Sequence, residues 1–258
     1  LPVASAQIKS CLLLAGLYAE GMTTVIENGI SRDHTERMLR GFGYDVTSSN
    51  NRISLEGGGS LKGCNIEVPS DISSAAFFMV AGCISKDSSI TLNSVNINPT
   101  RTGVIDILKL MGGNIELLNQ RLQAGELIAD IKVSSSNLKG IQIPENLVPL
   151  AIDEFPALFI AASCADGETV LTGAKELRVK ESDRIQVMAD GLTSLGIENH
   201  VLEDGIRILG GEFTKQASSI KSHHDHRISM AFAIASVRSK FDIEIEGVDN
   251  VKTSFPNF

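Results

Sequence analysis

Four segments of the chain are apolar on nearly every side of a helix and are rich in Ala, Gly and Ser. They begin at Ser5, Asp71, Asp153 and Asp225. This composition is typical of a helix that is buried on most faces and packs closely against its neighbours. The pattern therefore predicts four buried helices.

A turn and a short run with β-strand character follow each of these helices. The four runs cover residues 23–27, 89–93, 168–172 and 242–246. In the first three units an amphipathic helix comes next, over residues 35–42, 103–111 and 184–195. Gly43, Gly112 and Gly196 follow these helices and predict their ends, because glycine accepts the left-handed backbone conformation at little cost. Short strands then return, as in residues 53–55 and 206–208.

Each unit is therefore a buried helix, a strand, an amphipathic helix and further strands. This order recurs at least three times, and a fourth unit ends after its first strand. The interval is longer than the roughly 20–45 residues of a solenoid repeat, so we expect self-contained α/β units packed around a common axis. We predict loops at residues 57–59 and 119–125, and two domains, 1–69 and 70–258, that divide near Pro69.

The composition is that of a globular protein. The chain has 258 residues, 43% of them hydrophobic and 21% charged, which is enough for two domains. Its net charge of −8 argues against nucleic acid or an anionic membrane as the main partner. No apolar run reaches the ~20 residues that span a bilayer. The four cysteines are Cys11, Cys64, Cys83 and Cys164. Because they lack the spacing of metal ligands, we expect buried, reduced thiols and a cytosolic protein.

The densest group of charged residues lies in the sequence L-R-V-K-E-S-D-R-I, residues 177–185. Arg178, Lys180, Glu181, Asp183 and Arg184 lie here between a strand-like run and an amphipathic helix. Backbone N–H groups and the helix dipole favour an anion at such a junction. Arginine adds two-pronged recognition of carboxylate or phosphate, and the acids could move protons. The alternative is a helix cap with solvated ion pairs.

Charged residues that could act on a substrate open the third and fourth predicted buried helices. Asp153 and Glu154 open the third, either as a cap or as a carboxylate that serves as a general base or hydroxyl ligand. His226 and Arg227 follow Asp225 at the start of the fourth and are suited to binding an anion. The histidines nearby are adjacent in sequence, which does not bring them to one ion at helical spacing, so we expect no metal site.

Polar residues occupy matching positions in the first two units. Arg32 precedes the amphipathic helix of the first unit, and Ser5, Ala6 and Gln7 open its buried helix with a hydroxyl and an amide. A hydroxyl and an amide can bind phosphate or carboxylate oxygens without carrying charge. In the second unit, Asp71 and residues 98–101 fit a structural role better. If these helix ends converge, they form one anion-binding cleft.

Four motifs together resemble those of the 5-enolpyruvylshikimate-3-phosphate synthases, which are enolpyruvyl transferases. In chain order the motifs are S-A-Q-I-K-S-C-L-L-L-A-G-L, S-R-D-H-T-E-R-M-L, L-R-V-K-E-S-D-R-I and D-H-R-I-S-M-A-F-A. Their order and approximate spacing match as well, over residues 1–258. The second motif is more similar to the bacterial forms described as tolerant of glyphosate, an inhibitor that targets this family, than to the sensitive forms.

The resemblance implies an inside-out α/β barrel of two domains, each built from three similar units. It implies transfer of the enolpyruvyl group of phosphoenolpyruvate to the 5-hydroxyl of shikimate 3-phosphate, with release of phosphate. This step belongs to the shikimate pathway to chorismate and the aromatic amino acids. The resemblance implies no metal or organic cofactor. We expect a cytoplasmic protein, either a monomer or part of a longer chain, without a nucleic-acid or membrane partner.

The resemblance also assigns roles to individual residues. Asp153 is expected to bind ring hydroxyls of shikimate 3-phosphate and to act as a base toward its 5-hydroxyl. Glu181 is expected to exchange a proton with the methylene carbon of phosphoenolpyruvate. The other residues expected to bind shikimate 3-phosphate are Ser5, Ala6, Gln7, Arg32 and Lys180. Those expected to bind phosphoenolpyruvate are Gln7, Arg184, His226, Arg227 and Lys252, although the sequence around Lys252 departs from the family pattern by one residue.

Parts of the family pattern are missing from this sequence. They are an N-terminal Lys-Ser pair, two phosphate-binding arginines, an Asn-Ala-Gly-Thr segment and a helix at the C-terminus. We therefore expect a fragment that is inactive alone. Two other functions stay open: the related transferase that acts on UDP-N-acetylglucosamine, also an inside-out barrel, and a non-catalytic truncated or fused module. The S-R-D-H-T-E-R-M segment favours the shikimate enzyme over the first of these.

Overall fold

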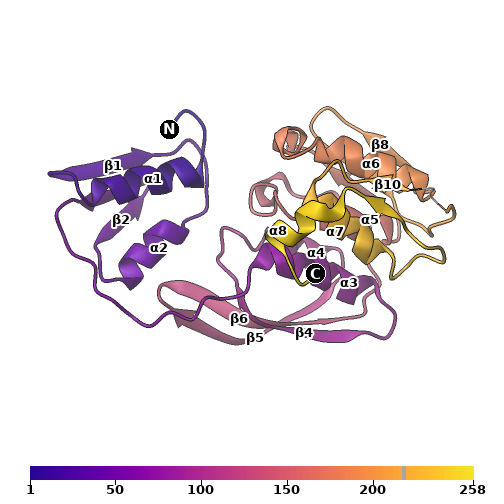
Figure 1. Ribbon diagram of the computed structural model, residues 1–258, viewed down its shortest axis with the longest axis horizontal. Helices are drawn as coiled ribbons and strands as arrows, with labels where there is room; N and C mark the ends of the chain where they lie inside the picture. The colour runs from indigo at the N-terminus through magenta and orange to yellow at the C-terminus, as the bar shows by residue number, and fades with distance from the viewer. Residues whose placement is uncertain (217–218) are drawn as a thin grey trace.

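The computed structural model describes residues 1–216 and 219–258, which form repeated units of helix and sheet (Figure 1). The first unit contains α1 (Ala6–Gly16), β1 (Met22–Ile26), α2 (His34–Gly41), β2 (Val46–Ser49) and β3 (Arg52–Glu56). The second contains α3 (Ile72–Ile84), β4 (Ser89–Asn96), α4 (Gly103–Leu110), β5 (Asn114–Gln123) and β6 (Glu126–Ser134).

The third unit repeats this order and adds two short 3₁₀ helices. Its elements are η1 (Glu145–Leu147), α5 (Phe155–Ser163), β7 (Glu168–Leu171), η2 (Lys175–Val179), α6 (Arg184–Ser194), β8 (Asn199–Val201) and β9 (Ile206–Leu209). The remaining elements are β10 (Ile220–Lys221), α7 (His226–Ala235), β11 (Ile245–Glu246), η3 (Val248–Asn250) and α8 (Val251–Ser254). The predicted repeat of buried helix, strand, amphipathic helix and strands is therefore confirmed.

Helices α1, α3 and α7 begin where a polar side chain satisfies a free backbone N–H. Ser5 accepts from the Ile8 N–H at the start of α1, and Asp71 accepts from the Ser74 N–H at the start of α3. Asp225 does the same for the Arg227 N–H at α7. Each cap stabilises its helix by about 1 kcal/mol, so the chain enters α1, α3 and α7 at the residues that the sequence pattern predicts. Helix α5 has no such side-chain cap and begins at Phe155, two residues after Asp153.

The three large sheets share one topology. Each has three antiparallel strands, and in each the last strand of the unit pairs with both others: β1-β3-β2, β4-β6-β5 and β7-β9-β8. Within a unit, the second of the three strands follows the amphipathic helix and is joined to the third by a hairpin. The units are thus similar in three dimensions as well as in sequence.

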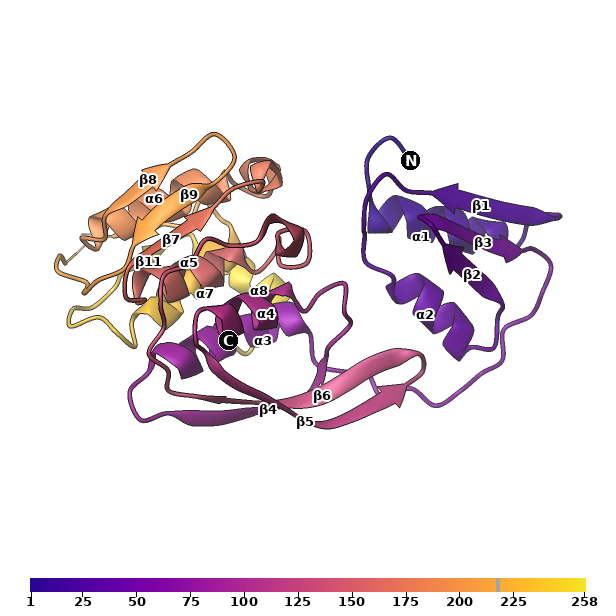
Figure 2. The same ribbon diagram turned by 180° about the vertical axis from the view of Figure 1, so that it is seen from behind.

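Two separate cores divide the molecule. One cluster of buried apolar residues belongs to residues 1–62, which we call the N-terminal unit, and contains Leu13, Leu39 and Leu55. The other belongs to residues 70–258, the C-terminal body, and surrounds α3, α5 and α7, which pack against one another. Figures 1 and 2 show the N-terminal unit to one side of the body, with the β5–β6 hairpin reaching below α2.

The prediction that all four helices are buried on most faces is wrong for α1. Its buried residues are Lys9, Leu13 and Gly16 only, whereas α3 and α5 bury most of their length. The reason is that α3, α5 and α7 cover one another, whereas the contacts of α1 in the described residues are with β1 and β3 of its own sheet and, through Lys9 and Ser10, with α2. Three apolar side chains of α1 stay exposed: Ile8, Leu12 and Leu14.

The exposure of the cysteines also differs between the N-terminal unit and the C-terminal body. All four are free, but only Cys83 on α3 is buried, and Cys164 is partly buried. Cys11 and Cys64 are exposed, so the expectation of a buried thiol is wrong for them. Cys11 is exposed because it lies on the uncovered helix α1.

Two sequence-based boundaries also need correction. Residues 119–123 continue strand β5 and are not a loop, because the ladder with β6 absorbs an irregularity between Leu118 and Arg121. Asn119 takes a positive φ of 51° there, which Asn tolerates better than most residues. The predicted loop survives only as the turn at Ala124 and Gly125. The strand expected over residues 242–246 is reduced to β11, which pairs with β10 in parallel. Among the described residues, the helices are all too short or too polar to span a bilayer.

Candidate active site

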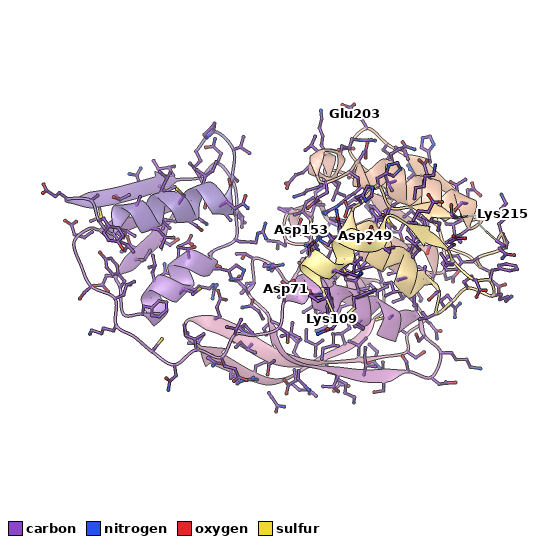
Figure 3. The ribbon with its side chains drawn as sticks, in the orientation of Figure 1. Asp71, Lys109, Asp153, Glu203, Lys215 and Asp249 are labelled. Carbon is purple, nitrogen blue, oxygen red and sulfur yellow. The ribbon has the colours of Figure 1, made fainter. Side chains whose placement is uncertain are left out.

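The N-terminal ends of three buried helices come together in the C-terminal body. Helices α3, α5 and α7 contact one another, and acidic residues lie at the start of each: Asp71 at α3, Asp153 and Glu154 at α5, and Asp225 at α7. In Figure 3, Asp71 and Asp153 lie on the side of the body that faces the N-terminal unit. The convergence of helix ends predicted from the sequence is therefore present within the body.

Asp153 lies at the centre of a ring of positive charges. Lys180 Nζ is 3.4 Å from its Oδ1, and Arg184 Nη1 is 3.7 Å from the same oxygen. Arg32, from the N-terminal unit, brings Nη1 to 3.7 Å from Oδ2, and Arg227 donates to the Asp153 carbonyl oxygen at 2.9 Å. Burial raises the pKa of Asp153, but these cations, with Arg227 the strongest, outweigh burial and hold the pKa below its usual value.

Arg184 links three acidic side chains from inside the protein. Only 1% of it is exposed, and its Nε donates to Asp225 Oδ2 at 2.9 Å while its Nη2 donates to Glu181 Oε2 at 2.5 Å. Its Nη1 is buried and has no hydrogen-bond partner among the described residues, although it lies 3.7 Å from Asp153 Oδ1. A buried guanidinium donor without an acceptor is costly, so this nitrogen is placed to receive an anionic ligand.

Asp225 is a buried residue that the sequence analysis did not assign to the site. Its carboxylate is fully buried, accepts from Ser182 and Arg184, and caps α7. Burial raises its pKa, but the hydrogen bond from Arg184 and that residue's charge hold the pKa below its usual value. Asp225 therefore stays ionised and fixes Arg184. The signal in the sequence was the acid directly before an otherwise apolar helix.

His226 and Arg227 lie on the side of α7 that faces α3. They line a hollow of about 240 Å³ together with Asp71, Ser73 and Ser74. Burial and the neighbouring charge of Arg227 lower the pKa of His226, so its imidazole is neutral at pH 7. Neutral His226 can donate or accept one hydrogen bond in this hollow, and Arg227 supplies the charge.

Glu154 was noted in the sequence but takes part in a network that could not be foreseen. It is buried, accepts a hydrogen bond from Ser73, and lies 3.8 Å from Arg101 Nη2. Arg101 also pairs with Asp71 at 3.1 Å, so α3, α5 and the loop before α4 are tied together. Burial raises the pKa of Glu154 in spite of these partners.

Two members of the charged segment have structural roles. Arg178 donates to the carbonyl oxygens of Leu202 and Glu203 and pairs with Asp183 at 2.7 Å. Asp183 in turn caps α6 by accepting from the Gln186 N–H. The alternative interpretation of the segment, a helix cap with ion pairs, is therefore right for these two residues. Lys180, Glu181 and Arg184 are the members that reach Asp153 or one another.

The N-terminal unit contributes Arg32 to this cluster. Ser5 caps α1, Ala6 is half-buried and Gln7 is exposed, and among the described residues neither Ser5 nor Gln7 bonds to the body. Lys9 fixes α1 on α2, because its buried Nζ lies 2.9 Å from Glu27 and 2.8 Å from Glu36. The starts of α1 and α2 both lie toward the body in Figure 1.

Lys252 is exposed on the short helix α8 and forms no ion pair with a residue in the described ranges. In those same ranges, 1–216 and 219–258, His, Cys, Asp and Glu do not form a cluster of three that could hold a metal ion. The acidic side chains of the site are instead paired with Arg and Lys.

Comparison with known proteins identifies the family of this chain. The family model for EPSP synthase (3-phosphoshikimate 1-carboxyvinyltransferase) matches residues 1–258. The 3-phosphoshikimate 1-carboxyvinyltransferase of Vesicomyosocius okutanii is 68% identical over the whole chain, and that of Hydrogenovibrio crunogenus is 60% identical. The chain spans 59% of the length of each of these relatives.

Solved structures support the same relationship. EPSP synthase from Acinetobacter baumannii matches with a TM-score of 0.95 and 60% identity, over 99% of this chain and 59% of that one. The enolpyruvyl transferase NikO from Streptomyces tendae shares the fold, with a TM-score of 0.74 at 17% identity over 95% of this chain and 55% of that one. The predicted architecture, an inside-out α/β barrel of repeated units, is confirmed by these neighbours. The chain belongs to the EPSP synthase family, the 3-phosphoshikimate 1-carboxyvinyltransferases.

Proposed function

We propose that this chain carries most of the active site for transfer of the enolpyruvyl group from phosphoenolpyruvate to the 5-hydroxyl of shikimate 3-phosphate. The observation that carries the proposal is the convergence of Lys180, Arg184, Arg227 and Arg32 on Asp153. Two substrates that each carry a phosphate and a carboxylate repel one another. Several fixed cations around one carboxylate offset that repulsion and hold the reacting groups together.

The two substrates have different partners in this proposal. Phosphoenolpyruvate binds Arg184 and Arg227 through its carboxylate and phosphate, with His226 and Gln7 beside it and Lys252 as a further contact. The free Nη1 of Arg184 and the hollow beside His226 support this placement. Shikimate 3-phosphate lies nearer the N-terminal unit, where Ser5, Ala6, Gln7 and Arg32 bind its phosphate and ring and Lys180 binds a hydroxyl.

Asp153 acts as the base in the proposed reaction. In the unliganded protein the surrounding cations keep it ionised. When two anionic substrates bind, their charges occupy those cations and weaken the effect on Asp153. Its affinity for a proton then rises at the moment when the 5-hydroxyl lies beside it.

Glu181 supplies the second proton transfer. Protonation of the methylene carbon of phosphoenolpyruvate allows the 5-hydroxyl oxygen to bond to the neighbouring carbon, while Asp153 takes the hydroxyl proton. Loss of a proton from the new methyl group and departure of phosphate then restore the double bond. Glu181 exchanges the proton on carbon in both steps, and its hydrogen bond from Arg184 Nη2 holds it near the phosphoenolpyruvate site.

The proposal extends to the organisation of the protein. Residues 1–69 belong to one domain, which binds shikimate 3-phosphate, and residues 70–258 to most of the other; the two separate cores support this division. The protein acts in the cytoplasm as a monomer on small molecules and not on nucleic acid. Because this chain spans 59% of its relatives, we expect it to bind substrate weakly and not to turn over alone.

Phosphate release is the experiment that tests the reaction. This chain is joined to the part of the Vesicomyosocius okutanii relative that it does not span, and we call the product the completed protein. Phosphate release from phosphoenolpyruvate is measured with shikimate 3-phosphate or with UDP-N-acetylglucosamine as acceptor. Release with shikimate 3-phosphate alone supports the proposal. Release only with the UDP-sugar, or with neither acceptor, contradicts it.

A further inference from the structure

The N-terminal unit touches the C-terminal body through a small polar interface at the start of α2. Within residues 1–216 and 219–258, every side-chain hydrogen bond between the unit and the body involves Asp33 or His34. We call this the α2 interface, formed by Asp33, His34, Arg37 and Gly41 on one side and by Asn98, Thr100, Ala124, Gly125 and Glu126 on the other.

Asn98 is the central donor of the α2 interface. It is completely buried, and its amide nitrogen donates to Asp33 Oδ1 at 2.7 Å and to Glu126 Oε2 at 3.2 Å. Its amide oxygen accepts from the backbone N–H and the hydroxyl of Thr100, which fixes the orientation of the amide. Asn98 therefore uses both amide hydrogens to join an acid of the unit to an acid of the body.

Glu126 completes the polar contact from strand β6. It is buried, and its Oε1 lies 2.6 Å from His34 Nδ1. Since a carboxylate only accepts, His34 carries a proton on Nδ1 and donates it. Asp33 is held ionised as well: burial raises its pKa, but hydrogen bonds from Arg37 and Asn98 bring the pKa below its usual value. The interface thus pairs the side-chain oxygens of Asp33 and Glu126 with N–H donors of Asn98 and His34.

Backbone contact makes the α2 interface close-fitting. A Cβ on Gly41 would lie 2.4 Å from the carbonyl oxygen of Ala124, and a Cβ on Gly125 would lie 2.2 Å from the carbonyl oxygen of Arg37. Gly125 also has a φ of 84°, which favours glycine. The β5–β6 turn can rest on α2 only because both glycines lack side chains.

Arg32 is covalently bound to Asp33 and has little else to fix it. Its side chain is 44% exposed, and its ion pair with Asp153 spans 3.7 Å. An ion pair of this length with a half-exposed partner is a weak interaction, which is too little to position a whole unit. The position of Arg32 relative to Asp153 therefore depends on the α2 interface next to it.

We propose that Asn98 and Glu126 are positioning residues that hold the start of α2 so that Arg32 reaches Asp153. The inference deepens the proposed function, on which it rests, by assigning two residues of the body to the placement of a substrate ligand from the N-terminal unit. Neither Asn98 nor Glu126 bonds to Asp153 in the structure, so they act through Asp33, His34 and the chain that leads to Arg32.

The first test measures geometry and is independent of activity. Spin labels are attached to Tyr18→Cys and Glu203→Cys in a Cys11→Ser, Cys64→Ser background; these sites are 91% and 89% exposed. Electron–electron double resonance then gives the distance distribution between unit and body. Asn98→Asp and Glu126→Ala should each broaden it. Glu116→Ala, which removes an exposed ion pair on the same sheet, should not. An unchanged distribution in both interface variants overturns the proposal.

The second test asks whether the interface acts through Arg32. In the completed protein, Asn98→Asp should lower kcat/KM for shikimate 3-phosphate by up to about 100-fold, because small misplacements of a binding group have effects of this size. In the double variant with Arg32→Ala, Asn98→Asp should lower kcat/KM only slightly further. If Asn98 has a purely structural role, the losses of the two single variants add. Additive losses overturn the proposal. If the completed protein shows no turnover, the proposed function fails, and the distance measurement alone decides the role of the interface.

Discussion

Asp153 and Glu154 are adjacent carboxyl groups whose pKa values move in opposite directions. Asp153 faces Arg227, Lys180, Arg32 and Arg184, which outweigh the effect of burial and lower its pKa. Glu154 points into the body, where burial prevails over Ser73 and Arg101 and raises its pKa. One step along the chain therefore separates a carboxylate that neighbouring cations keep ionised from a carboxyl group whose burial favours the neutral form.

Replacing Asp153 should lower stability at neutral pH. When folding lowers the pKa of a carboxyl group, that group stabilises the folded state at a pH above its usual pKa of 3.8. The stabilisation is lost as the pH falls through the lower pKa of the folded state. Asp153→Asn should therefore unfold at lower urea than the parent at pH 7, and the difference between the two proteins should shrink as the pH falls below 3.8. A loss of stability that does not change with pH would show that the charge of Asp153 does not stabilise the folded state.

Replacing Glu154 should have the opposite effect. When folding raises the pKa of a carboxyl group, that group does not destabilise the folded state at a pH below its usual pKa of 4.5. It destabilises the folded state as the pH rises from there through the raised pKa. Glu154→Gln keeps the size and an acceptor for Ser73. It should raise the urea midpoint at pH 7 and leave it unchanged in acid. A lower midpoint at pH 7 would mean that the ion pair with Arg101 outweighs burial.

Asp153→Asn should also remove most catalysis. General-base assistance contributes about 10²–10⁴-fold, so kcat of the completed protein should fall by that factor, with a smaller change in the KM for shikimate 3-phosphate. The initial rate of phosphate release, measured over a range of shikimate 3-phosphate concentrations, gives both kcat and KM. Thr169→Ser is a suitable control, because Thr169 is buried in the same unit and its hydroxyl has no hydrogen-bond partner in the part of the chain that the structure describes. A kcat within threefold or so of the parent would rule out a base at this position.

Arg184→Lys should show that the shape of the guanidinium matters as well as its charge. Lysine cannot reproduce the three directed contacts toward Asp225, Glu181 and Asp153. Loss of a directed donor of this kind costs about 10²–10³-fold, so kcat/KM for phosphoenolpyruvate should fall by that amount. Arg207→Lys, at an exposed pair with Glu168, is the matched control and should retain activity. Equal activities of the two variants would contradict the role of Arg184.

Two neighbouring leucines test the description of α1. Leu13 is fully buried, whereas Leu12 is 42% exposed. Leu13→Ala should destabilise this chain by about 2–5 kcal/mol, and Leu12→Ala by much less. Urea denaturation of the two variants measures the difference. Similar losses would mean that α1 is covered in solution on the side where the structure leaves it open.

The sequence predicts the repeated units well because each depends on local signals. A polar residue and the apolar run that follows it predict α3, α5 and α7, and a terminal glycine predicts the ends of the amphipathic helices α2, α4 and α6. The burial of α1 could not be predicted in this way, because an apolar pattern does not say whether a partner covers it. Strand β5 was missed over residues 119–123 because Asn119 has turn chemistry, and only the ladder with β6 keeps it extended.

The candidate site was predictable as a group but not residue by residue. Five charges within residues 177–185 indicated an anion site, yet Arg178 and Asp183 differ from Lys180 and Arg184 only in their direction in space. Asp225 and Asn98 act through contacts with residues far away in the sequence. Such roles depend on the packing of α7 and α2 against other elements, which no local pattern specifies.

The most direct measurement of the central claim is a crystal structure of the completed protein with both shikimate 3-phosphate and phosphoenolpyruvate. The account predicts one shared site, with the 5-hydroxyl within hydrogen-bond distance of Asp153 and phosphoenolpyruvate accepting from the free Nη1 of Arg184. Substrates bound away from Asp153, or an Arg184 Nη1 that stays without an acceptor while both substrates are present, would contradict it.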